Sequence, residues 1–202
     1  MKTFAFIAAF GATALAMAKQ KSYSWTFDPR VAIADATSDP LDPNTTIPGE
    51  TVIPLPIADS GAVVSIDEVC VDITHTFVSD VVMALFAPNG SSFAILIDGR
   101  EFGSGDDLIG LYCFETGAPE FSFNPAGTTV PTGTYGPNDA RGFGDLVGVE
   151  KNGTWSLVIL DLVGQDVGSI GSVSIEMTNV PEPTSIGLLG LGAAAMLLRR
   201  RG

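Results

Sequence analysis

Hydrophobic and polar side chains alternate along the middle of the chain. Between residues 69 and 77, Val, Ile, Phe and His occupy every second position, and Cys, Asp and Thr fill the positions between them. Such alternation predicts a half-buried β-strand, because successive side chains of a strand point to opposite faces of its sheet. His75 shares its phase with the apolar positions, so we expect it to point into the core.

Further strands are expected at residues 81–86, 93–97, 154–160 and 172–177. The first two are apolar runs, and in the last Val173, Ile175 and Met177 share one face. The first two flank Asn89-Gly90, a pair typical of tight hairpin turns. Because short strands are separated by Gly, Pro and Asn and no helical periodicity is sustained, the pattern predicts an all-β, antiparallel β-sandwich.

Prolines crowd the region before residue 60. Pro40, Pro43, Pro48, Pro54 and Pro56 all fall there. Proline lacks the backbone N–H that a central strand needs, so this region is expected to be an extended lead-in or an edge strand. We place the lead-in at residues 19–44 and the sandwich at residues 45–178.

The two ends differ from this body in charge. The chain has 202 residues, with 10 Lys and Arg against 23 Asp and Glu, a net charge of −13. Residues 22–180 hold 22 of the acids and only 4 basic residues, which leaves them at −18. Phosphate binding needs clustered Lys and Arg, so this balance argues against a nucleic-acid partner.

The amino end has the composition of an export signal. Lys2 precedes a small, apolar run that closes with Ala16-Met17-Ala18. A charged start, an apolar stretch and small residues at a cleavage point are typical of a secretory signal peptide, which we place at residues 1–18.

The carboxyl end combines Pro181-Glu182-Pro183, an apolar run of 14 residues, and Arg199, Arg200 and Arg201. As a short hydrophobic helix the run would extend about 21 Å, against a hydrocarbon core of about 30 Å. Residues 179–202 resemble the PEP-CTERM sorting signal of Gram-negative bacteria. The resemblance implies recognition by an exosortase, transient anchoring in the inner membrane, and delivery to the cell surface or an exopolysaccharide matrix. The alternative is an ordinary tail anchor.

Six segments of the body, in order, resemble the P domain (homoB domain) of kexin- and furin-like proprotein convertases. They are Ile73–Val81, Ala87–Ser91, Gly105–Leu108, Gly133–Tyr135, Asn152–Leu157 and Gly168–Ile170. The sequence departs from that pattern at Ser79, Gly136 and Ser172. The resemblance implies a jelly-roll-like sandwich, a domain that in convertases packs on a subtilisin-type catalytic domain and stabilises it.

Catalysis is not expected from these residues. A Ser-His-Asp relay needs an imidazole base beside a reactive serine, and His75 is the only histidine in the sequence. No Gly-x-Ser-x-Gly segment is present either. We therefore predict a non-enzyme, for which a protease label would reflect family association alone.

Aspartates at strand ends and in glycine-rich loops suggest calcium, which prefers oxygen ligands on irregular backbone. Some P domains bind calcium, and the resemblance places four residues on their acidic positions: Asp80, Asp106, Asp107 and Asp161. No dense EF-hand-type loop is present, so ordinary solvated acids are the alternative.

Cys70 and Cys113 are the only cysteines. In an exported chain they could pair, and the closed loop would contribute about 4 kcal/mol in the chain-entropy model. Two buried free thiols are the alternative, because Cys70 lies on the opposite strand face from Val69 and Val71.

Two functional interpretations stay open. The first is an exported structural or adhesive sandwich, with exopolysaccharide as a candidate partner. The second is an accessory domain for a separate subtilisin-like protease. A sugar site is a further alternative, on the loop aromatics Tyr112, Phe114, Phe121, Phe123 and Tyr135.

Overall fold

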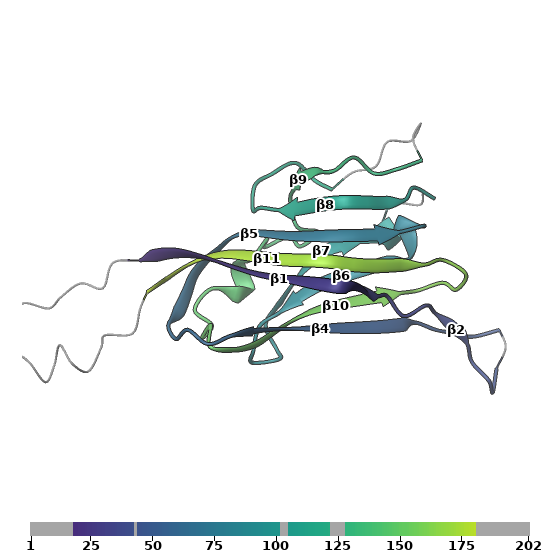
Figure 1. Cartoon of the computed structure of the whole chain (residues 1–202), viewed down its shortest axis with the longest axis horizontal. Helices are drawn as coiled ribbons and strands as arrows, with labels where there is room; N and C mark the ends of the chain where they lie inside the picture. The colour runs from purple at the N-terminus through teal and green to yellow at the C-terminus, as the bar shows by residue number, and fades with distance from the viewer. Residues whose placement is uncertain (1–17, 43, 102–104, 122–127, 181–202) are drawn as a thin grey trace, which may run out of the picture. The chain divides into compact units, whose positions relative to one another are not determined.

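The fold is a β-sandwich of two sheets, seen in a computed structural model that describes residues 18–42, 44–101, 105–121 and 128–180 (Figure 1). Two tiny strands, β2 (Thr37–Ser38) and β3 (Thr46–Ile47), pair outside both sheets. The signal peptide, the sorting signal and its apolar run lie outside the described residues, apart from Ala18, Asn179 and Val180.

The larger sheet has the strand order β1-β11-β5-β8-β9. Its strands are β1 (Lys19–Ala32), β11 (Gly168–Val180), β5 (Ala62–His75), β8 (Leu108–Phe114) and β9 (Gly133–Tyr135). All neighbours are antiparallel except β8 and β9, which are parallel.

The smaller sheet has the order β4-β10-β6-β7 and is antiparallel throughout. Its strands are β4 (Gly49–Ile57), β10 (Gly153–Asp161), β6 (Val81–Phe86) and β7 (Phe93–Asp98). Three 3₁₀ turns complete the described elements: η1 (Val78–Asp80), η2 (Gly99–Glu101) and η3 (Gly144–Leu146). The predicted all-β sandwich is confirmed.

The core between the sheets takes alternate side chains from both. Trp155 of β10 and Tyr112 and Phe114 of β8 are fully buried. Trp155 donates its ring N–H to the Lys151 carbonyl at 3.0 Å, and the Tyr112 hydroxyl donates to the Val130 carbonyl at 2.8 Å. The ring N–H of Trp155 and the hydroxyl of Tyr112 therefore both have hydrogen-bond partners inside the core.

The apolar runs of the sequence correspond to strands. The Asn89-Gly90 hairpin joins β6 to β7, with Gly90 at a φ of +68° and the Asn89 side chain accepting from the backbone N–H groups of Ser91 and Ser92. Residues 19–32, placed in the lead-in, form β1 at one edge of the larger sheet, and Pro54 and Pro56 lie on β4, an edge of the smaller one.

The alternation of apolar and polar residues did not predict strand β8. Its inward residues Tyr112 and Phe114 alternate with Ile109 and Leu111, which are 53% and 50% exposed. Because both faces of this strand carry large apolar side chains, the alternation that marks a half-buried strand disappears.

The outward-facing residues differ between the two sheets. On β4, β10, β6 and β7 most are apolar: Val52, Pro54, Pro56, Val158, Leu160, Val82, Ala84, Phe86, Phe93 and Ile95. We call this set the apolar face. On β1, β11 and β5 most are polar: Ser22, Ser24, Thr26, Ser172, Ser174, Glu176, Thr178, Glu68, Asp72 and Thr74. We call this set the polar face.

Candidate functional site

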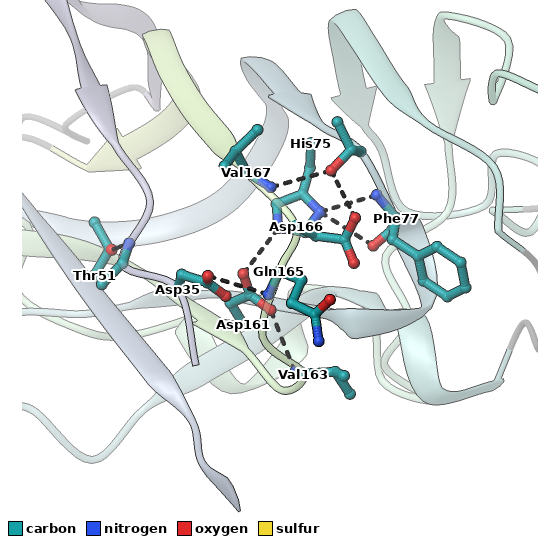
Figure 2. A network of polar contacts seen from close by, with 11 residues as sticks. Asp35, Thr51, His75, Phe77, Asp161, Val163, Gln165, Asp166 and Val167 are labelled. Carbon is teal, nitrogen blue, oxygen red and sulfur yellow. Dashed lines mark hydrogen bonds and ion pairs between the residues drawn. The ribbon is translucent and has the colours of Figure 1, made fainter. Parts of the chain in front are cut away.

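A buried histidine–carboxylate pair lies where two strands end. His75 is the last residue of β5 and Asp161 the last of β10. The His75 Nε2 and Asp161 Oδ2 atoms are 3.2 Å apart, and both side chains are almost completely buried (Figure 2). On the other side of the ring, Nδ1 lies 3.1 Å from the carbonyl oxygen and 3.2 Å from the backbone nitrogen of Phe77. Both ring nitrogens thus have partners within the fold.

This arrangement favours a structural role for His75 over a catalytic one. A general base needs a ring nitrogen within hydrogen-bond reach of the proton that it abstracts. In His75 one nitrogen faces Asp161 and the other faces the Phe77 backbone, and the ring is out of contact with solvent. The prediction that His75 points into the core is confirmed.

The loop after β10 is tied to the same region. The Thr76 hydroxyl donates to Asp166 Oδ1 at 2.8 Å and accepts from the Val167 backbone N–H at 3.0 Å. The Gln165 N–H donates to Asp35 Oδ2 at 3.2 Å (Figure 2). These contacts join the loop to the end of β5 and to the segment that follows β1.

Asp80, in η1, faces this cluster. Its carbonyl accepts from the Leu162 N–H at 2.9 Å, and its side chain is buried. Burial, together with the nearby Asp166 and Asp161 carboxylates, raises the pKa of Asp80 to about 6. Burial also raises the pKa of Asp161, although its hydrogen bond to His75 acts in the opposite direction. The neighbouring Asp166 and Asp161 carboxylates thus oppose ionisation of the buried Asp80.

The other two predicted calcium ligands belong to a neighbouring segment. The Asp106 carbonyl accepts from the Val78 N–H at 2.8 Å, which places this backbone beside η1. Asp106 Oδ2 is buried and has no hydrogen-bond partner among the described residues. The Asp107 backbone is held by Thr128 and Val130.

Side chains that could bind a metal come close together at one place in the larger sheet. Within residues 18–180, excluding the undescribed positions, the one trio with ligand atoms within 4.8 Å of one another is Glu68, Cys70 and Cys113. The four predicted aspartates therefore do not form such a group. The trio is not a metal site, since its sulfurs are bonded to each other.

Cys70 of β5 and Cys113 of β8 form a disulfide in the structure. The two residues are directly opposite each other in the antiparallel register, with their Cα atoms 4.0 Å apart. Both side chains point to the outside of the larger sheet. Cys70 can therefore pair although it lies on the opposite strand face from Val69 and Val71, because Cys113 lies on the same face as Cys70.

Four of the five aromatics considered for sugar binding pack in the core or against it. Tyr112, Phe114 and Phe121 are buried, and Phe121 packs edge-on against Tyr135 with ring centroids 4.9 Å apart. Phe123 lies outside the described residues. Nearby is a hollow of about 320 Å³, lined by Glu101, Glu120, Phe121, Gly136, Pro137, Asn138, Asp139 and Ala140.

Sequence reasoning missed Asp35 and Asp166. Asp166 lies in the turn Gly164-Gln165-Asp166, directly after the predicted strand 154–160. A carboxylate at a strand end was the signal used for Asp161, and it applied equally here. Asp35 gave no such signal, because its role depends on a contact 130 residues away in the chain.

Comparison with known proteins identifies the carboxyl end. Residues 179–201 match the PEP-CTERM protein-sorting motif. That motif indicates exosortase-dependent export to the surface of Gram-negative bacteria, as the sequence predicted. In the part of the chain that the structure describes, no helix is long and apolar enough to cross a membrane.

The body is similar to parts of much longer proteins. It is 30% identical, over 124 residues, to a calcium-dependent protease of Trichormus variabilis, an alignment that covers 61% of this chain and 15% of that protein. The serine protease of Aeromonas sobria matches at a TM-score of 0.42 with 16% identity, covering 82% of this chain and 28% of that one. The structure of its complex with the chaperone ORF2 matches at a TM-score of 0.41 with 15% identity, covering 81% of this chain and 27% of that one.

Proposed function

We propose that the protein is an exported, non-catalytic β-sandwich with a structural or adhesive role in the cell envelope or exopolysaccharide matrix. The observation that carries this proposal is the sorting motif, which begins at residue 179, within the last two residues of β11. The sandwich before it has its own core and a disulfide suited to an oxidising compartment.

The non-catalytic assignment rests on His75. Its ring is enclosed between Asp161 and the Phe77 backbone, which supports a role in holding the ends of β5 and β10 together. A protease activity would need another base, and none of the contacts described above supplies one.

Localisation tests the proposal directly. The chain is followed by fractionation and surface labelling in its native organism, with and without the exosortase. We expect surface delivery to require the exosortase and to be lost in Glu182→Ala, while Glu50→Gln, an exposed acid on β4, behaves like the parent protein. Delivery to the surface in the absence of the exosortase would contradict it.

A second candidate function is that of an accessory domain, resembling a P domain, for a separate subtilisin-like protease. It is favoured by the 124-residue similarity to a protein named as a protease. We expect the purified chain to raise the melting temperature of such a protease produced without a sandwich domain of its own. An unchanged melting temperature at saturating concentrations of the chain would refute this alternative.

We also propose that calcium stabilises the sandwich by drawing together Asp80, Asp106, Asp107 and Asp161, whose ligand atoms do not form a group within 4.8 Å in this structure. Two features support it: the mutual repulsion around Asp80, and the unpartnered buried oxygen of Asp106. Oxygen donors of this kind suit calcium, which would add compensating charge. We expect calcium to raise the melting temperature of the parent protein but not that of Asp80→Asn, and equal shifts would contradict the assignment.

A further inference from the structure

The outside of the smaller sheet is an extended apolar surface. Val52 of β4 is 52% exposed and Phe93 of β7 is 39% exposed, although these strands lie on opposite edges of the sheet. Between them, Val158 of β10 is opposite Val52 and Phe86 of β6 is opposite Phe93. The apolar face therefore spans all four strands, and such continuous surfaces mark sites of association.

Charge is almost excluded from this surface. On the outward side of β4, β10, β6 and β7, all of which the structure describes, the ionisable side chains are Glu50 and Asp98, and Asp98 is opposite Val82 and paired with Arg100. The Phe86 and Phe93 rings stack with centroids 4.9 Å apart, which removes part of each ring face from further contact. The uncharged polar side chains on this surface are those of Thr154, which is exposed, and Ser156, which is half-buried.

Acidic groups border this surface at the free edge of β7. The Asn138 N–H donates to the Leu96 carbonyl at 3.3 Å, and the Asn138 amide donates to Glu101 at 2.8 Å. Glu101 and Asp139 line the 320 Å³ hollow described above, together with Glu120. The nearby Arg100 is occupied by its ion pair with Asp98.

A second copy of the chain is a poor occupant. Four strands about 4.8 Å apart and six residues long cover about 400 Å². A stable interface buries about 800 Å² on each partner, so contacts would have to extend from the apolar face onto its surroundings. In a pair of copies this would bring together two bodies that each carry a charge of −18.

We propose that the apolar face docks a different protein: a folded domain with an apolar patch bordered by Lys and Arg, one of which enters the hollow beside β7. This inference rests on the proposed role as an exported, non-catalytic sandwich. Charged side chains are few on the apolar face, as they are at the centre of a protein interface. A polysaccharide would need hydrogen-bonding groups and open ring faces, which this surface offers sparsely.

Site-specific photocrosslinking tests the proposal in the native organism. A benzoylphenylalanine at position 52 probes the apolar face, and one at position 109, equally exposed on β8, is the matched control. We expect position 52 alone to crosslink to one protein, identified by mass spectrometry. The purified partner should bind the full chain at least tenfold more weakly with Val52→Asp or Phe93→Asp, but not with Ile109→Asp.

The charge of the partner is tested by salt. Binding should weaken as ionic strength rises, and Glu101→Gln with Asp139→Asn should reduce that dependence. Crosslinking to a second copy, to lipid or to polysaccharide overturns the proposal, as does equal labelling from both positions or salt-independent binding. Surface delivery is followed in the same cells. If docking fails while delivery still depends on the exosortase, this inference is refuted and the proposed function is not.

Discussion

The polar face and the apolar face share one core but differ in chemistry, although β8, beside the polar face, also exposes Ile109 and Leu111. On the polar face, Ser172 and Ser174 of β11 alternate with the buried Val173 and Ile175. On the apolar face, Val158 of β10 alternates with the buried Leu157 and Ile159. Polar alternation is sufficient for an exposed sheet, so the valines and prolines of the smaller sheet exceed what folding requires. The difference supports the proposal that the smaller sheet docks a partner.

The largest expected effect concerns the polar face. Replacing both Cys70 and Cys113 by Ala removes the link between β5 and β8, which closes a loop with a sequence separation of 43. We expect the free energy of unfolding to fall by about 4 kcal/mol, because the unfolded chain gains freedom. Chemical denaturation measures this, and intact mass with alkylation before and after reduction verifies the bond. Two alkylated thiols without reduction would contradict it.

The second-largest effect on stability is expected at the buried Asp80. In the unfolded chain this carboxyl ionises near its ordinary pKa of 3.8, whereas the folded protein keeps it protonated up to about pH 6. The folded state therefore loses stability as pH rises through this window, and the charged form is unfavourable at pH 7.

We accordingly expect Asp80→Asn to stabilise the calcium-free protein at pH 7 by roughly 1 to 3 kcal/mol and to flatten its stability between pH 4 and 6. Denaturation at several pH values in a chelator measures both. Asp145→Asn, which alters an exposed acid paired with Arg141, is the control. Equal pH profiles for parent and Asp80→Asn would show that this carboxyl is not perturbed.

A smaller effect is expected from the ion pair on the polar face. Arg30 Nη1 lies 2.6 Å from Asp72 Oδ2, and about a third of each side chain is exposed. Asp72→Asn should cost less than about 1 kcal/mol, and the cost should shrink as salt rises because exposed pairs are screened. A larger, salt-independent loss would contradict this expectation and show that the Arg30–Asp72 pair stabilises the fold more than an ordinary exposed ion pair does.

The smallest effect on stability is expected on the apolar face. Val52→Thr should change the free energy of unfolding by about 0.5 kcal/mol or less, because about half of this side chain is exposed. The fluorescence of a dye that binds apolar surfaces should fall in this variant. Ile109→Thr, on the other sheet, should leave the dye signal nearly unchanged, and an equal decrease would remove the contrast between the two faces.

Local patterns predicted much of the fold but little of the candidate site. The runs at 81–86 and 154–160 are buried on one face and bounded by turn residues, so their strands could be recognised from neighbouring positions alone. The cluster around Asp80 depends on three segments that meet only after both sheets form. No local pattern distinguishes Asp166, which joins the cluster, from Asp107, which is held by a different segment.

The first and last strands of the sandwich are neighbours, and this has a mechanical consequence. β11 lies between β1 and β5, with ten residue pairs to the former and twelve to the latter. Lys19 of β1 pairs with Asn179 of β11, so the two ends of the sandwich lie side by side. A pull between residues 19 and 180 therefore opens the β1–β11 hydrogen bonds one after another, starting from that end. Single-molecule force spectroscopy between these two ends should record a gradual, low-force separation of β1 from β11 before the rest of the sandwich unfolds.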